Sequence, residues 1–176
     1  IFRHGERTTF NFYPRDPHQN QTFHPYGLGA LTNNGKLMMF KLGEILKQNY
    51  EDFLGDDYYL QDKITARSTG TPRTIMSASL VLAGLFPPSK ELTWKSDLMW
   101  QPVPVFSKPF EEEDLLDAAF CNIRNKILSN LPNNPTIWNA YIKPHRELFS
   151  YVQNNTGWKI TDLRDLLQIY FILKAE

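Results

Sequence analysis

The chain has 176 residues, 41% of them hydrophobic and 14% aromatic, which is the composition of a globular protein with a sizeable core. Its 19 basic and 19 acidic side chains give a net charge of zero, which argues against nucleic acid or an anionic membrane surface as its partner. No apolar run approaches the length of a membrane span. Any affinity for phosphate must therefore come from a local cluster of charge.

The first seven residues place a histidine between two arginines. Residues 1–2 are apolar and are expected to form the end of a buried strand, after which Gly5 lets the backbone turn. Because ligands usually bind at the carboxyl ends of strands in an α/β sheet, we expect Arg3, His4 and Arg7 at a ligand site. The guanidiniums would keep the imidazole neutral and nucleophilic, and they can bind a phosphate in bidentate fashion. A basic surface turn with an ordinary histidine is the alternative at this point.

A long loop and an amphipathic helix follow. Residues 11–30 are rich in Pro, Asn, His and Gly and predict a loop, and a loop of this length usually has a functional task, such as forming the wall of a site. Thr32 is the expected N-cap of a helix over residues 33–53, which Gly55 would close. The spacing predicts an apolar helix face made of Met38, Leu42, Ile45, Leu46, Tyr50 and Phe53.

A second strand, turn and helix carries another arginine. Residues 63–67 are a strand candidate, and the next helix is expected over residues 73–85, ended by two prolines. The strand expected at residues 1–2, the helix over residues 33–53 and the strand at residues 63–67 follow in the order of a parallel crossover, which implies an α/β fold. Arg73 falls in the first turn of the second helix, where free N–H groups attract anions, and it would complete a phosphate cage. Taken alone, Arg67 and Arg73 are better explained as solvated or carboxylate-paired residues. The apolar positions of this helix are Met76, Leu80, Leu82, Ala83 and Phe86.

The remaining residues predict helices without recognisable chemistry. The acidic run at residues 111–114 is expected to be a solvated turn. The single cysteine, Cys121, is either a small buried hydrophobe or the partner of a cysteine outside this chain. Asn20 and Asn154 begin Asn-x-Thr sequons and are the expected glycosylation sites. Apolar helix positions are expected at Trp138, Tyr141, Leu148, Phe149 and Val152 and, after the cap Thr161, at Leu163, Leu166, Leu167, Tyr170 and Leu173.

Several motifs occur in an order typical of one family. Arg-His-Gly-Glu-Arg-Thr at residues 3–8, Arg-Ser-Thr-x-x-x-Arg-Thr-x-Met-Ser-Ala at residues 67–78 and Leu-Phe-Pro-Pro at residues 85–88 closely resemble the histidine acid phosphatases of the prostatic, lysosomal and insect-venom type. The stretches at 53–58 and 98–105 strengthen a resemblance that runs to about residue 110.

This resemblance implies a three-layer α/β fold of the phosphoglycerate-mutase type with a helical insertion, incomplete in this chain. Residues 1–110 would form the amino-terminal part of the phosphatase domain and residues 111–176 part of the insertion.

The resemblance also implies roles for individual residues. His4 would be the nucleophile that becomes phosphorylated, without a metal or other cofactor. Trp100 matches an aromatic near the substrate pocket, with a place in the core as the alternative, and Arg67 matches a position outside the catalytic set. The expected protein is a secreted or lysosomal acid phosphatase that hydrolyses small phosphomonoesters or phosphoproteins. Three guanidiniums would hold the phosphate, those of Arg3, Arg7 and Arg73.

One part of the family's machinery is not found in this sequence. The family uses a His-Asp pair whose aspartic acid protonates the leaving alkoxide, and none of His18, His24 and His145 is followed by Asp. We therefore expect a fragment that lacks the general acid and is inactive by itself. Cys121 falls where the prostatic group has a cysteine bridged to the far half. The resemblance also allows a homodimer and a membrane anchor in the carboxyl-terminal part, and the sequence decides neither.

Other functions remain as alternatives. Phosphoglycerate-mutase relatives share Arg-His-Gly, but the second segment and the Trp-Gln-Pro stretch favour the acid phosphatases. An inositol-polyphosphate phosphatase of the same superfamily is a closer competitor. A secreted binding protein or venom antigen could keep the phosphate cage without turnover.

Overall fold

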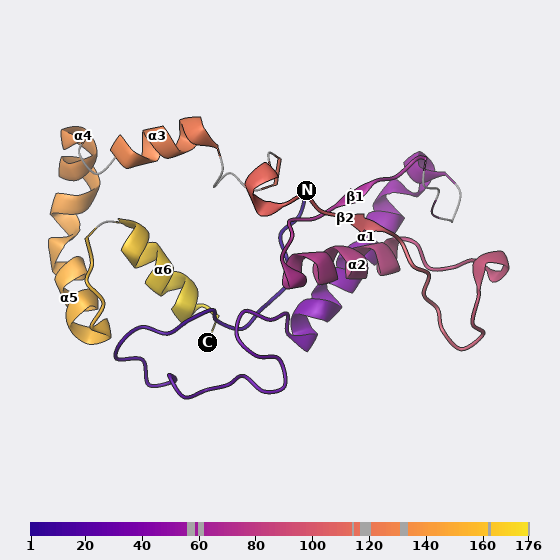
Figure 1. Ribbon diagram of the computed structural model, residues 1–176, viewed down its shortest axis with the longest axis horizontal. Coiled ribbons are helices and arrows are strands. Elements are labelled where there is room, and N and C mark those ends of the chain that lie inside the picture. Colours follow the sequence, from indigo (N-terminus) through magenta and orange to yellow (C-terminus); the bar gives the residue numbers. More distant parts are fainter. Residues whose placement is uncertain are drawn as a thin grey trace. The chain divides into compact units, whose positions relative to one another are not determined.

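A computed structural model describes residues 1–55, 59, 62–113, 115–116, 121–130, 134–161 and 163–175 (Figure 1). The chain forms two compact units. The first unit contains Ile1–Arg7 and Ala30–Leu116, and the second contains Thr8–Gly29 and Asp117–Glu176. These units alternate along the chain, and the predicted division at residue 110 stays a prediction.

The first long helix of the first unit, α1, spans Asn33–Leu54, as its end signals predict. The Thr32 hydroxyl accepts a hydrogen bond from the Gly35 N–H at 3.0 Å, and Gly55 ends the helix with a φ of 73°. The predicted apolar face was largely wrong, because Met38 and Ile45 are about half exposed. The buried residues of α1 are Gly35, Met39 and Gly43.

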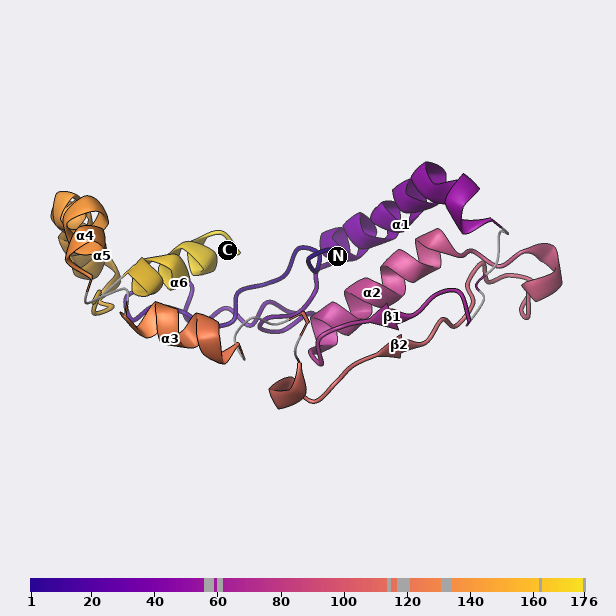
Figure 2. The ribbon, with the colours of Figure 1, turned by 90° about the horizontal axis from the view of Figure 1, so that it is seen from above.

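The second helix explains which face of α1 is buried. Helix α2 spans Pro72–Leu85, within one residue of the prediction, and lies beside α1 (Figure 2). A Cβ atom added to Gly43 would lie 2.1 Å from Val81 O, and one added to Gly84 would lie 2.2 Å from Phe40 O. The two helices therefore touch backbone to backbone at these glycines. Among the larger apolar side chains of α1, Met39 is buried, whereas Met38 and Ile45 stay outside.

The sheet consists of two short parallel strands. Strand β1, Ala66–Arg67, pairs with β2, Val105–Phe106, in the register Ala66 with Val105 and Arg67 with Phe106. Both strands lie alongside α2 (Figure 2). Strand β1 confirms the end of the strand candidate at residues 63–67, whereas β2 had no prediction. A parallel pair connected through a helix is the element of an α/β fold.

The expected buried strand at residues 1–2 is wrong. Ile1 is fully exposed, Phe2 is about half exposed, and the structure gives neither residue a strand conformation. A strand needs a neighbouring strand for its backbone hydrogen bonds, and none of the described residues supplies one here. The nearest extended pairing is a single antiparallel bridge between Arg7 and Leu31.

Two short 3₁₀ helices complete the first unit, η1 at Lys90–Leu92 and η2 at Phe110–Glu112. The acidic run that contains η2 was expected to be solvated, but Glu113 is only 1% exposed. Its carboxylate accepts hydrogen bonds from the N–H groups of Leu115 and Leu116 at 3.0 and 2.8 Å, and this explains its burial. Asp114 lies outside the described residues.

The second unit combines the loop Thr8–Gly29 with helices. The loop is free of helix and strand, as predicted for residues 11–30, and its Arg15 N–H donates to Thr156 O at 3.0 Å. The Thr161 N–H and hydroxyl both donate to Asp165 at 2.6 Å, beside the start of α6. The helices are α3 (Asn122–Asn130), α4 (Pro135–Ile137), the π-helix η5 (Trp138–Ile142), the 3₁₀ helix η6 (Lys143–His145), α5 (Arg146–Thr156) and α6 (Leu163–Leu173).

The apolar positions predicted for these helices are mostly exposed. Leu148 on α5 and Leu167 on α6 are about half exposed, while Ile169 and Ile172 are the buried residues of α6. The side chain of Trp138 lies outside the described residues. Within the described part of the chain, no helix is both long enough and apolar enough to cross a membrane.

Candidate active site

The loop that carries His4 rests on the start of helix α1. Gly5 is buried, and a Cβ atom added to it would lie 2.4 Å from Gly35 O. The Glu6 carbonyl accepts the Thr32 N–H at 3.0 Å, one residue before the bridge from Arg7 to Leu31. Glycines at positions 5 and 35 therefore allow a close contact between two backbones that any larger side chain would block.

The same loop is tied to helix α2. The Gly5 N–H donates to Ser77 Oγ at 3.2 Å, and the Ser77 hydroxyl donates to Arg73 O at 2.7 Å. Arg73 lies in the first turn of α2, directly after Pro72. The loop with the histidine and the helix with the third arginine thus meet at one buried serine.

The His4 imidazole has a defined tautomer. Its Nδ1 lies 2.8 Å from Gly5 O, and because a carbonyl oxygen only accepts, Nδ1 must carry the hydrogen. In the neutral ring, Nε2 then keeps its lone pair. Partial burial lowers the pKa of His4, and the positive charges of Arg73, Arg3 and Arg7 lower this pKa further, whereas the hydrogen bond to Gly5 raises it.

The three arginines act on one another as well. Burial, followed by the charges of Arg73 and Arg3, lowers the pKa of Arg7, and burial and Arg3 lower the pKa of Arg73. Three guanidiniums that repel one another around a neutral imidazole form a region where an anion would be stabilised. The structure therefore brings together the four residues expected to form the phosphate site: Arg3, His4, Arg7 and Arg73.

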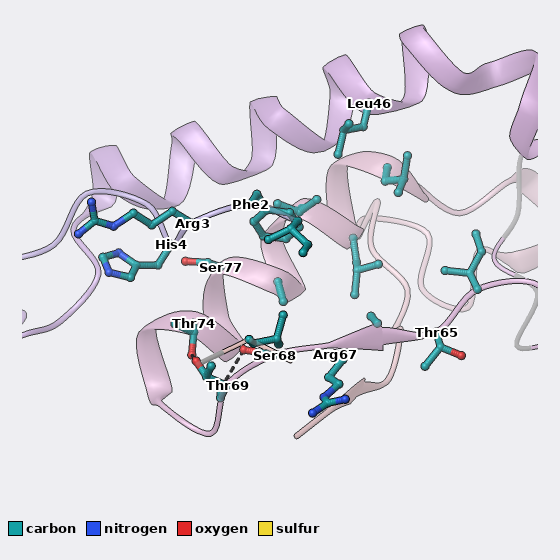
Figure 3. Close-up of a pocket in the computed structure, with 18 residues that line it drawn as sticks. Phe2, Arg3, His4, Leu46, Thr65, Arg67, Ser68, Thr69, Thr74 and Ser77 are labelled. Atoms are coloured by element: carbon teal, nitrogen blue, oxygen red, sulfur yellow. Dashed lines mark hydrogen bonds between the residues drawn. The ribbon is translucent and has the colours of Figure 1, made fainter. Parts of the chain in front are cut away.

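A cavity of about 460 Å³ opens beside this cluster. Arg3 and His4 lie at one end of the cavity, close to Ser77, and Arg67 lies away from them (Figure 3). More than half of the lining residues are apolar, among them Leu46, Val81 and Leu82. Because its walls are largely apolar, the cavity does not itself resemble a phosphate site, and Arg3 and His4 are the members of the charged cluster that line it.

The model of the histidine phosphatase superfamily (branch 2) matches residues 3–124 of this chain. The chain belongs to this superfamily. It is 34% identical to rat lysosomal acid phosphatase and 36% identical to the honeybee venom acid phosphatase Acph-1, in both cases over its whole length. Human prostatic acid phosphatase is 39% identical over 69% of the chain.

The chain spans less than half of these relatives, namely 41%, 46% and 31% of their respective lengths. The resemblance to the prostatic, lysosomal and venom group is confirmed. The long helices and the small parallel sheet of this chain agree with an incomplete α/β fold of the histidine phosphatase superfamily.

Arg67 has a different environment from the arginines of the cluster. Its Nη2 donates to Glu113 Oε1 at 2.7 Å, so it forms the carboxylate pair that was the alternative for this residue. Hydrogen bonds from the backbone of Leu116 and Leu115 lower the pKa of Glu113, as does the neighbouring guanidinium, while burial raises it. The sequence gives no signal for this partner, because the residues of the pair are separated by 46 positions.

Trp100 does not line the cavity beside His4. Its ring packs edge-on against Trp94, with centroids 6.2 Å apart, and the Trp94 Nε1–H donates to Trp100 O at 2.9 Å. Trp100 is also about one third exposed, so it does not lie in the core either. Its predicted contact with substrate stays a prediction.

The remaining predicted residues belong to the second unit. Asn20 and Asn154 are exposed, as a glycan acceptor must be. Cys121 is exposed too, which contradicts the alternative that it is a small buried hydrophobe. Among the residues that the structure describes, no three His, Cys, Asp or Glu side chains gather in a way that could hold a metal.

Proposed function

We propose that the protein containing this chain is an acid phosphatase that hydrolyses phosphate monoesters through a phosphohistidine on His4. The observation that carries this proposal is a His4 ring held through Nδ1, whose pKa is lowered by partial burial and by the charges of three arginines. Membership of the histidine phosphatase superfamily and the acid phosphatase names of its relatives support the same activity.

The first chemical step follows from this arrangement. Arg3, Arg7 and Arg73 bind the phosphate dianion and spread its charge, which is the main requirement of phosphoryl transfer. Nε2 of His4 attacks phosphorus in line with the ester oxygen, so a P–N bond forms while the P–O bond breaks. The ring becomes cationic, and the hydrogen bond from Nδ1 to Gly5 O stabilises this charge.

The leaving alkoxide needs a proton in this step. No His-Asp pair occurs in the sequence, so we assign the general acid to a part of the protein outside this chain. Water then attacks the phosphohistidine, the P–N bond breaks, and inorganic phosphate leaves the neutral imidazole ready for another turnover.

The lysosomal and venom relatives favour a lysosomal or secreted protein. Exposed sequons at Asn20 and Asn154 agree with that location. Cys121 would pair with a cysteine outside this chain, and the helices after residue 110 would belong to an insertion beside the phosphatase domain.

The test uses the full-length protein and p-nitrophenyl phosphate. We expect His4→Ala to lower kcat by at least about 10⁴-fold and to abolish base-stable, acid-labile labelling of the protein by a radioactive phosphate ester. His145→Ala is the matched control, because His145 is exposed and lies in the second unit.

A parent protein that binds phosphate but never becomes labelled would instead support a binding protein without turnover. Inositol polyphosphates are offered as competing substrates. Preferred hydrolysis of these compounds would indicate the related inositol-polyphosphate phosphatase instead of an acid phosphatase. A His4→Ala protein as active as the parent would overturn the proposal.

A further inference from the structure

We propose that Ser77 is a positioning residue that aligns the His4 imidazole with Arg73, an inference that rests on the proposed function. The Ser77 side chain is only 1% exposed and lies between the two segments that carry these groups. Its hydroxyl accepts the Gly5 N–H at 3.2 Å and donates to Arg73 O at 2.7 Å. One hydroxyl group can make both bonds, since it has one hydrogen and two lone pairs.

The contacts of Gly5 extend this connection to the nucleophile. The Gly5 N–H is held by Ser77, and the Gly5 carbonyl accepts Nδ1–H of His4 at 2.8 Å. The backbone of Gly35 also packs tightly against Gly5, because a Cβ atom on Gly5 would lie 2.4 Å from Gly35 O. A shift of Gly5 would therefore turn the ring and move Nε2 away from the line of attack, and a displacement of 1 Å can cost about 10²-fold in rate.

The other bond of Ser77 ends at Arg73, one turn earlier on α2. The nucleophile loop and the first turn of α2, which carries Arg73, are thus both hydrogen-bonded to one hydroxyl. Ser79 offers a matched comparison on the same helix. Its hydroxyl makes the same kind of bond, to Ile75 O at 3.0 Å, but on the exposed side of α2.

The experiment is a single turnover with full-length protein in excess over p-nitrophenyl phosphate. At protein concentrations that saturate the substrate, the rate constant for nitrophenol release reports phosphorylation of His4 and does not depend on the fraction of chains that are unfolded. We expect Ser77→Ala to lower this rate constant about tenfold, because the buried Gly5 N–H loses its acceptor and the loop shifts. Ser79→Ala is expected to keep the parent rate constant.

Rescue by a second hydroxyl separates positioning from simple packing. Ser77 borders the cavity beside His4, so the extra methyl group of Ser77→Thr has space while the hydroxyl is kept. We expect Ser77→Thr to stay within about threefold of the parent. Should Ser77→Ala fail to fold, Ser77→Cys replaces it, because the thiol fills a similar volume but is a weak acceptor, and the same decrease of about tenfold is expected.

The possible outcomes distinguish the two proposals. Parent rate constants in both Ser77→Ala and Ser77→Cys would overturn the role of Ser77, and so would a Ser77→Thr protein as slow as Ser77→Ala. A change only in the amount of folded protein would show a structural role and would also overturn it. A parent protein without labelled histidine would instead overturn the proposed function.

Discussion

The two units of this chain differ in how their side chains are held. In the first unit, backbones meet at Gly5 with Gly35 and at Gly43 with Gly84, and the charged cluster lies beside the first of these contacts. In the second unit, helices α5 and α6 leave leucine and tyrosine side chains about half exposed. The comparison teaches that the proposed phosphate site lies where glycines and hydrogen bonds position the backbone closely.

The strongest test of this difference is Gly5→Ala. The new Cβ atom would lie 2.4 Å from Gly35 O, and because both sides of the contact are backbone, the loop with His4 must move. We expect kcat/KM of the full-length protein to fall by about 100-fold or more. Gly70→Ala is the matched control, because its Cβ atom would lie 3.6 Å from Lys108 O, an ordinary contact. Equal activities of the two variants would show that the close contact is not needed.

A smaller effect is expected on the titration of His4. Arg73 lowers the pKa of His4, so Arg73→Gln should raise that pKa, whereas Arg73→Lys keeps a positive charge and should raise it less. Because a lowered pKa keeps the ring neutral at more acidic pH, the raised pKa would make the nucleophile lose its lone pair at a higher pH. Histidine NMR signals of the full-length protein without substrate measure this directly. If the pKa of His4 in Arg73→Gln equals that of the parent, the charge of Arg73 does not act on the His4 imidazole.

The smallest effects should come from the exposed face of the second unit. Leu167 on α6 is 51% exposed, and we expect Leu167→Ala to change the free energy of unfolding by less than about 0.5 kcal/mol. Ile169 on the same helix is 3% exposed, so Ile169→Ala should destabilise by about 2–5 kcal/mol. Urea unfolding of the full-length protein compares them. A large cost at Leu167 would mean that this face is covered in the complete protein.

The end signals of the helices allowed the best predictions from sequence. Thr32 caps α1 through a hydrogen bond to an N–H three residues away, and α2 ends at Leu85, just before the two prolines expected to stop it, so both helices occur almost where they were expected. These signals act within one helical turn and need no distant partner. The residues of the charged cluster were predicted from short motifs too, namely those at residues 3–8 and 67–78.

Burial was predicted less well, because it depends on partners that are distant in sequence. The exposed Ile1 and the buried Glu113 both contradicted expectation, the first for want of a neighbouring strand and the second because of Arg67 and two backbone N–H groups. In the sequence, Ser77 stands out only as part of the motif at residues 67–78. Its bond to Gly5 spans 72 positions, a separation at which local spacing carries no information.

The sequence by itself therefore determined the family, the two long helices and the four residues of the expected phosphate site, since these depend on short motifs and local caps. Only the tertiary structure decided which helix face is buried, that Arg67 pairs with Glu113, and that Ser77 joins the His4 loop to Arg73. The physical reason is that each of these contacts is made by groups brought together through folding. Hydrogen bonds and close packing depend on distance in space, which the order of residues does not give.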